Sequence, residues 1–354
     1  MKDGIEDVHN LALTALEIQM VRPKTYPDAP DEDFEVGKTI KDLDAESGFV
    51  VGIEREVDGM VDIIYDPDEI IEDEDNLVRM PAGVAACFND LYPLGQMAKR
   101  HDVKLSLHTP YYMDLGSDMF SENEEEANLA NQYFETVRQA GVILDALDGD
   151  IVVTNVGLYD DKKRSREQTE ENIYNNLGNI MDWWTSVGLK PRLGIEVTGQ
   201  QDVFGSTEQI FQLCDDIEGL TPVLNFPHYQ ARTKGSLNTS SDFVDLISEF
   251  ASFCGDKGVY ASFSNVEFDP EGNEKWLTPL KKGEIRFERL AEALADLKPE
   301  ITLISSSPLL EHDAVYMRTL TERVLSKKAA KQLKEDKKKL EEQEAAAAEE
   351  PESE

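Results

Sequence analysis

Short apolar runs rich in β-branched residues alternate along this chain with longer amphipathic stretches. Seven of the apolar runs have the length and composition of buried strands: 16–21, 103–107, 150–154, 192–196, 222–225, 259–263 and 301–304. The stretches between them have helical periodicity: 81–100, 124–147, 165–187, 206–217, 240–253, 284–297 and 308–325. Such an alternation of strands and helices predicts an α/β fold, in which helices cover a parallel sheet.

The number of strands bears on how the sheet closes. A closed (β/α)8 barrel needs one strand more than the seven found. The first predicted helix, around 5–15, begins almost at Met1. We therefore expect a barrel whose first strand is missing at the N-terminus: either the barrel is incomplete, or this sequence starts inside a longer one. A doubly wound open sheet is the alternative, but no Gly-x-Gly-x-x-Gly motif follows any strand.

Two segments interrupt the alternation within a barrel predicted to span 1–326. Residues 26–80 are acidic, and 49–65 within them have the pattern of a hairpin that turns at Asp58-Gly59. We interpret this region as an insertion on the barrel rim. Residues 327–354 form a charged, low-complexity tail, expected to be a frayed helix that passes into disorder. Acidic residues flank the lysines of the tail and argue against a strong phosphate-binding patch.

The charge of the chain is extreme for its size. It has 35 Lys and Arg against 72 Asp and Glu, a net charge of −37. The acidic residues are spread over the whole sequence, for example in 28–33, 69–75, 122–126 and 167–171. An acidic surface that binds one basic partner would instead be confined to one part of the molecule. At about 1 M ionic strength the Debye length is about 3 Å, so such self-repulsion is tolerated. The pattern favours adaptation to molar salt, as in a halophilic archaeon.

Composition excludes several other classes. The three cysteines, Cys87, Cys214 and Cys254, lie far apart, which argues against a disulfide scaffold. No run of about 18 apolar residues could span a membrane, and the first residues lack the apolar core of a signal peptide. We expect a protein of the reducing cytoplasm with no membrane partner.

Candidate chemistry lies at the ends of the predicted strands. In an α/β barrel, polar residues at the C-terminal ends of strands face the active site. Two of the five histidines, His108 and His228, fall there, and Glu196 closes an otherwise apolar strand. A buried carboxylate is costly unless it is solvated or coordinated. Imidazole and carboxylate together suit Zn²⁺, Mn²⁺ or Fe²⁺. The alternative is three polar side chains that are hydrogen-bonded at the barrel mouth.

Two tyrosines, Tyr111 and Tyr112, follow His108 in the same strand-end loop. Their rings could stack on a base or a sugar of a substrate. The alternative is packing within the loop.

Several strand-end segments resemble the endonuclease IV (apurinic/apyrimidinic endonuclease) family. They are a histidine-containing loop, a segment around a metal-bridging Glu, an Asp-x-x-His-x-x-Ala-Arg-like segment and two shorter stretches: 105–115, 194–205, 224–232, 263–268 and 307–313. The resemblance covers about 4–320, without the insertion at 26–80. It implies a xylose-isomerase-like TIM-type barrel.

That family nicks DNA 5′ to an abasic site with three metal ions, which activate a water, neutralise the phosphate and stabilise the leaving oxygen. This chain matches the family's ligand pattern at His108, Glu196 and His228. It departs from the pattern at six positions: Asn155 for His, Asn225 for Asp, Ser262 for His, Glu274 for Asp, Trp276 for His and Ser306 for Glu.

These departures bear on the metal content. Amides in place of carboxylates remove negative charge, and three closely spaced dications would then repel one another strongly. The resemblance therefore implies fewer than three ions of Zn or Mn. His108, Glu196 and a weaker Asn155 oxygen would hold one, and His228 with Glu274 another. Asn225 is a further weak ligand.

Three functions follow from these residues. The first is a hydrolase: a metal-dependent phosphodiesterase that acts on abasic-site DNA in repair, with Glu196 as catalytic residue. Tyr111 and Tyr112 would contact the substrate, and Arg232 and Lys234 its phosphates. The second is a non-catalytic barrel that binds nucleic acid or another ligand. The third is a sugar or sugar-phosphate isomerase or epimerase, which needs two acid–base groups. It ranks last because only Glu196 is an obvious base.

Overall fold

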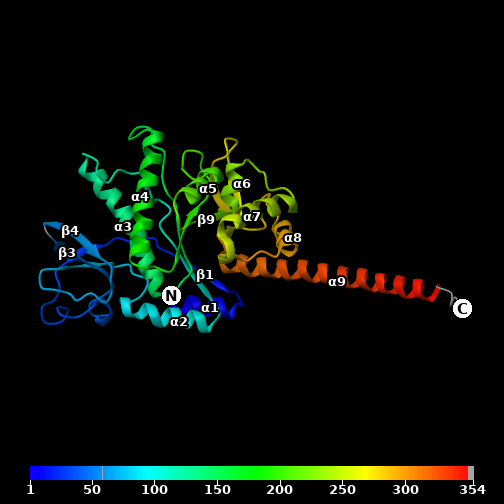
Figure 1. Ribbon diagram of the computed structural model, residues 1–354, viewed down its shortest axis with the longest axis horizontal. Helices are drawn as coiled ribbons and strands as arrows, with labels where there is room; N and C mark the ends of the chain where they lie inside the picture. Colours follow the sequence, from blue (N-terminus) through cyan, green and yellow to red (C-terminus); the bar gives the residue numbers. More distant parts are fainter. Residues whose placement is uncertain (58, 350–354) are drawn as a thin grey trace.

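The main sheet of the computed structural model contains seven parallel strands and curves into a nearly closed barrel (Figure 1). The structure describes residues 1–57 and 59–349, with side chains as far as 341. The strands, in their order in the sheet, are β1 (Ala15–Gln19), β6 (Lys104–His108), β7 (Ile151–Thr154), β8 (Arg192–Glu196), β9 (Leu220–Asn225), β10 (Val259–Phe263) and β13 (Ile301–Ser305). The seven predicted strands are confirmed, with bounds that differ by at most two residues.

The two edges of this sheet, β1 and β13, face each other without forming a ladder. The strands β7, β8, β9 and β10 are buried along their whole length, whereas β1 and β13 are partly exposed. The described residues thus leave a seam between β1 and β13. An eighth strand would have to fill this seam to close the barrel.

Helices cover the outside of the barrel (Figure 1). They are α1 (Lys2–Asn10), α2 (Leu91–Arg100), α3 (Glu124–Ala146), α4 (Arg166–Ser186), α5 (Thr207–Asp216), α6 (Phe226–Arg232), α7 (Ser240–Cys254) and α8 (Phe287–Leu297). Ser206 and Gln209 form a capping box at the start of α5. Thr239 and Asp242 form a second capping box at the start of α7.

Helix α2 begins ten residues later than predicted, at Leu91 instead of Pro81. The intervening residues form turns that pack on the insertion. A Cβ on Gly83 would lie 2.4 Å from the ring of Phe49, so the close approach there requires glycine. The apolar residues of this stretch thus pack against the insertion and do not form the buried face of a helix.

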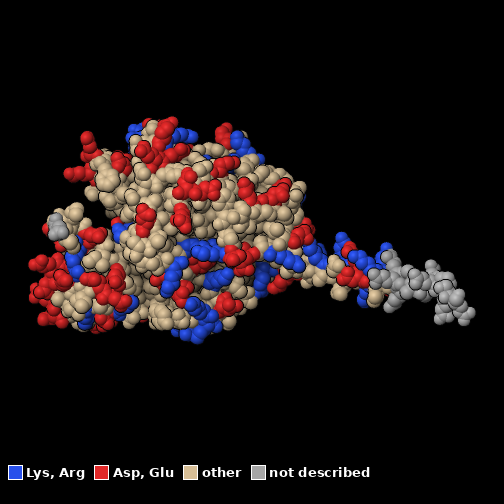
Figure 2. Space-filling model, viewed as in Figure 1, with Lys and Arg blue, Asp and Glu red and all other residues tan. Residues whose placement is uncertain are grey.

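The insertion is a second, antiparallel sheet. Its strands are β2 (Tyr26–Asp28), β3 (Val50–Val57), β4 (Met60–Ile64) and β5 (Asn76–Arg79), in the order β2-β5-β3-β4. The hairpin expected within 49–65 corresponds to β3 and β4, and Asp58 of its turn lies outside the described residues. Arg55 of β3 forms ion pairs with Asp75 and Glu69. Asp and Glu crowd the surface of the region (left in Figure 2).

The C-terminal segment is one long helix, α9 (Glu311–Glu349). The sequence predicted a helix over 308–325 and then a frayed tail, but the helix continues without a break and projects from the barrel (Figure 1). The end of the predicted tail, 350–354, lies outside the described residues. No helix in the described part of the chain is long and apolar enough to cross a membrane.

Candidate functional site

Three of the predicted site residues meet at the carboxyl-end mouth of the barrel. His108 ends β6, Glu196 ends β8, and His228 lies in α6 directly after β9. His108 Nε2 is 3.4 Å from Glu196 Oε2, and His228 Nδ1 is 3.8 Å from the same oxygen. The side chains of His108 and Glu196 are only 12% and 6% exposed. The predicted convergence of these three residues is thus present in the structure.

A hairpin outside the barrel adds a fourth residue. It consists of β11 (Asn265–Phe268) and β12 (Glu274–Thr278), and it places Glu274 Oε2 3.2 Å from His228 Nε2. The main-chain N–H of Glu274 donates to the carbonyl of Gly199, at 2.8 Å. A Cβ on Gly199 would lie 2.6 Å from Glu274 Oε2. The absence of a side chain at Gly199 therefore lets the carboxylate reach His228.

Both histidines are oriented in the same way. The Nδ1 atom of His108 lies 2.6 Å from the carbonyl oxygen of Thr109, and that of His228 lies 2.8 Å from the carbonyl oxygen of Val197. A carbonyl can only accept, so each Nδ1 carries the hydrogen. Each Nε2 is then turned to a carboxylate. Metal-binding histidines in proteins are commonly fixed in this way, through the nitrogen that does not bind the ion.

The electrostatics separate the two carboxylates. Burial alone would lower the pKa of His108, but its contact with the Glu196 carboxylate outweighs this and raises that pKa to about 9. Burial alone would raise the pKa of Glu196, but the contact with His108, the nearby His228 and the hydrogen bond from Asn225 together hold this pKa below its usual value. Burial raises the pKa of Glu274; the neighbouring His228 opposes this rise and the Glu196 charge adds to it. The pKa values of the two carboxylates are thus shifted in opposite directions, toward the charged form of Glu196 and the protonated form of Glu274.

Asn225, a predicted weak ligand, orients its neighbours. Its Nδ2 donates to Glu196 Oε1 at 3.0 Å, and its Oδ1 accepts from the main-chain N–H of His228 at 3.1 Å. The amide oxygen is therefore used to cap α6. Asn225 positions Glu196 and His228 instead of offering a free oxygen to an ion.

Several buried oxygens at this mouth have no hydrogen-bond partner among the described residues. They lie where the resemblance implies metal ligands: Asn155 Oδ1, Ser262 Oγ, Ser306 Oγ and Glu274 Oε2, whose 3.2 Å contact with His228 Nε2 lacks the geometry of a hydrogen bond. Buried polar atoms are nearly always satisfied, so a group of exceptions in one place points to a bound water, ion or ligand.

The donor set fits a divalent ion only in part. In the portion of the chain that the structure describes, no three His, Cys, Asp or Glu side chains are arranged to hold one ion. What the site offers is two imidazole–carboxylate pairs, His108–Glu196 and His228–Glu274. The partnerless Asn155 oxygen is an additional neutral donor. Each pair would need oxygens from water or substrate to complete a coordination shell.

A buried polar group beneath the mouth was missed by the sequence reasoning. Glu17 of β1 accepts from the Tyr260 hydroxyl at 2.8 Å, and that hydroxyl is 2.5 Å from Ser106 Oγ. Burial raises the pKa of Glu17. The sequence did hold a clue, since Glu17 interrupts the apolar run of its strand. Its pairing with Ser106, which brings the two onto the same face of the sheet, could not be predicted from the sequence.

The four predicted substrate-binding residues have different surroundings. Tyr111 is 84% exposed and Tyr112 is also exposed, and their rings meet edge to face. Lys234 is exposed as well. Arg232, in contrast, uses Nη1 to donate to Thr198 Oγ1 and to carbonyl oxygens of the loop after β8, including that of Gln200. This nitrogen braces the loop, so the structure does not support Arg232 as a simple phosphate contact.

The comparisons with known proteins identify the family. Residues 89–306 match the model of the xylose isomerase-like TIM barrels, and the chain belongs to this family. The chain is 29% identical to an uncharacterised protein of Methanocaldococcus jannaschii over 219 residues, which are 61% of this chain and 76% of the relative.

Two solved structures are also similar. One is endonuclease IV from Thermus thermophilus, with a TM-score of 0.56 and 16% identity over 92% of this chain and 94% of that chain. The other is a D-tagatose 3-epimerase-like protein, with a TM-score of 0.51 and 19% identity over 69% of this chain and 84% of that chain. At these identities the likeness shows the barrel fold alone, because one barrel supports many chemistries.

Proposed function

We propose that this chain is a metal-dependent phosphodiesterase that acts on abasic-site DNA with fewer than three metal ions. The observation that carries the proposal is the pair of histidines whose Nδ1 atoms are fixed by main-chain carbonyls and whose Nε2 atoms face carboxylates. The choice of substrate rests on the strand-end segments that resemble the endonuclease IV family, among them 105–115, 194–205 and 224–232.

The residues divide into two sets of donors. His108, Glu196 and the Asn155 oxygen would hold one ion, and His228 with Glu274 a second. When bound, a divalent ion supplies Lewis acidity and charge neutralisation to a phosphate group. The Glu196 carboxylate, whose pKa is lowered, is suited to accept a proton from the attacking water.

The acidic surface constrains how DNA would bind. With a net charge of −37, long-range attraction to phosphates is unfavourable, and molar salt would weaken it further. Affinity must then come from close contacts. The exposed rings of Tyr111 and Tyr112 beside the mouth are suited to stack on a base or to fill the gap left by a missing one.

A duplex with one abasic site, incubated with the protein and Mn²⁺ or Zn²⁺ in molar salt, tests this proposal. We expect a nick at the abasic site that Glu196→Gln abolishes. Glu267→Gln is the matched control, because Glu267 lies on the same hairpin as Glu274 but is exposed. Cleavage that is unchanged in Glu196→Gln, or no cleavage with any divalent ion, would contradict the proposal.

A specific observation also favours a sugar or sugar-phosphate isomerase or epimerase. This function was ranked last from the sequence because a second acid–base group was missing. Glu274 lies beside Nε2 of His228, whereas Glu196 lies beside Nδ1 of the same ring. Burial raises the pKa of Glu274. Deuterium uptake from heavy water, at the carbon beside the carbonyl of a ketose, would favour this function over DNA cleavage.

A further inference from the structure

We propose that the projecting part of α9 pairs with the same helix of a second copy of this chain, in antiparallel orientation. This proposal does not depend on the function of the barrel mouth. It rests on the exposure of the helix, the spacing of its leucines and the order of its charges.

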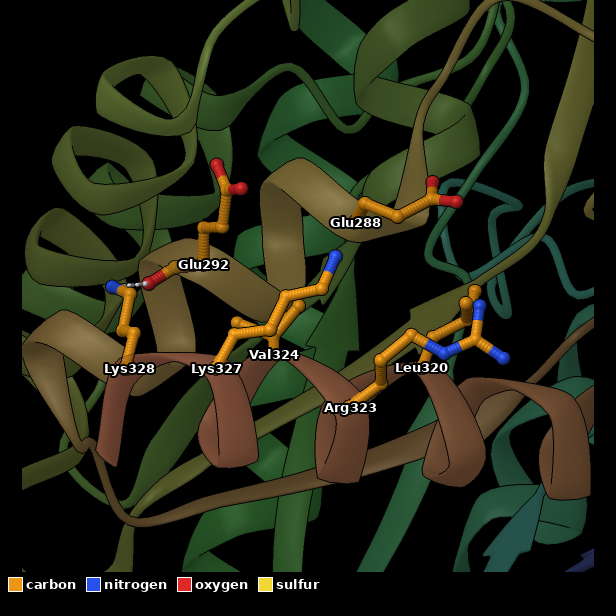
Figure 3. Close-up of a pocket in the computed structure, with 7 residues that line it drawn as sticks. All are labelled: Glu288, Glu292, Leu320, Arg323, Val324, Lys327 and Lys328. Atoms are coloured by element: carbon orange, nitrogen blue, oxygen red, sulfur yellow. Dashed lines mark hydrogen bonds between the residues drawn. The ribbon is translucent and has the colours of Figure 1, made fainter. Parts of the chain in front are cut away.

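The contact between α9 and the barrel ends near Lys328. Leu320 and Val324 are buried against α8, and Lys328 donates to the carbonyl of Glu292 at 3.0 Å (Figure 3). These residues line a cleft of about 210 Å³ between the two helices. Every residue from 329 to 341 is exposed. The helix from 329 to 349, about 32 Å long at 1.5 Å per residue, thus extends from this anchor into solvent (Figure 1).

Two leucines lie on one face of this projecting helix. Leu333 and Leu340 are seven residues apart and are 62% and 56% exposed. A spacing of seven keeps both on one stripe, and Ala347 continues it in the sequence. An isolated helix gains nothing from leucines held in water, whereas a second helix would bury them.

The charges of the C-terminal sequence from 327 onward are separated into two blocks. Residues 327–340 contain seven Lys against Glu335 and Asp336, a net charge of +5, and residues 341–354 contain seven Glu and no cation, a net charge of −7. Acidic residues toward the C-terminal end of a helix oppose its dipole. A second helix that runs the other way would set its lysines against these acids and compensate them.

The charge of the barrel also favours the antiparallel arrangement. Removing the two blocks (+5 − 7 = −2) from the total of −37 leaves −35 on residues 1–326. A parallel pair would hold two such bodies side by side, where they repel each other at low salt, although molar salt screens this repulsion. An antiparallel pair centred on Leu340 would place them at opposite ends. It would also set position 333 of one copy opposite position 347 of the other.

Sedimentation of the full chain in molar salt tests this pairing. We expect a dimer of about 80 kDa, twice the mass of 39.8 kDa, and a monomer for the double variant Leu333→Gln/Leu340→Gln, since Gln preserves helix propensity and charge. The matched control, Lys331→Gln/Glu335→Gln, lies off the leucine stripe and should remain a dimer. A wild-type monomer at every concentration, or a dimer that survives the leucine variant, would overturn the proposal.

Cysteine cross-linking tests the orientation. In an antiparallel pair centred on Leu340, Leu340→Cys should form an intermolecular disulfide under mild oxidation, and Leu333→Cys should not. Efficient cross-linking of Leu333→Cys would instead indicate parallel helices and would overturn the antiparallel assignment.

Discussion

The two imidazole–carboxylate pairs of the mouth differ in what holds them. His108 and Glu196 end two strands of the barrel and are almost fully buried, and Asn225 fixes Glu196 from the side. His228 and Glu274 come from a short helix and from a hairpin outside the barrel. Among the described residues, Glu274 Oε2 has no partner besides its 3.2 Å contact with His228 Nε2. The first pair is thus a rigid part of the fold, whereas the second is assembled by segments that can vary separately. We expect changes in the first pair to affect both stability and activity, and changes in the second to affect mainly activity.

The largest effect is expected from Glu196→Gln. Loss of the carboxylate removes the partner of His108, so the pKa of His108 should fall from about 9 toward its ordinary value of 6.5. Cleavage should fall by about 100-fold or more, because a positioned acid–base group contributes about 10²–10⁴. NMR titration of His108 and a cleavage assay measure the two effects. A pKa of His108 that does not move would show that the pair is not coupled.

The pH dependence of stability sharpens the same difference. The pKa of His108 is higher in the folded chain than in the unfolded one. Its contribution to the free energy of unfolding is therefore fully present below about pH 6.5 and is lost as the pH rises through about 9. The free energy of unfolding should fall over this interval, by about 3 kcal/mol at most. Denaturant titrations at several pH values measure this fall. It should vanish in Glu196→Gln and persist in Glu274→Gln, and an equal loss in both variants would contradict the comparison.

Glu274→Gln should have a smaller effect. Burial already disfavours the charged form of Glu274, so its removal should change the free energy of unfolding by less than about 1 kcal/mol. Cleavage should fall about tenfold, which is about 1.4 kcal/mol in activation free energy. Thermal unfolding and cleavage rates test this expectation. A destabilisation larger than that of Glu196→Gln would reverse the roles of the two pairs.

The smallest effect on cleavage is expected from Gly199→Ala. The new methyl group would lie 2.6 Å from Glu274 Oε2, so the carboxylate must move away from His228. We expect a loss of about 1 kcal/mol in stability from this crowding and a weaker second metal site. The pKa of His108 should stay near 9 by NMR. A lowered pKa of His108 would mean that the two pairs are mechanically linked.

The first pair could be predicted from the sequence and the second only in part. Strand periodicity located the ends at His108 and Glu196, since buried parallel strands are continuous apolar runs. Glu274 emerged only through the family resemblance. The β11–β12 hairpin is short and lies outside the sheet, so its position depends on contacts such as that with Gly199. These contacts have no pattern in the sequence.

The same limit applies to other parts of the molecule. Glu17 interrupts an apolar strand, but the register that sets it on the face of Ser106 belongs to the sheet. The insertion was expected to be one hairpin, and β2 and β5 are too short to be predicted before their partners are known. In each case the missing information is a long-range pairing.

The metal content of the purified protein tests the central claim most directly. After loading with Zn²⁺ or Mn²⁺ and dialysis against molar potassium chloride, which removes ions held loosely by the acidic surface, we predict one or two tightly bound ions per chain. Glu196→Gln should lose the first and Glu274→Gln the second. Three ions per chain, none, or a content that neither substitution changes would contradict the account.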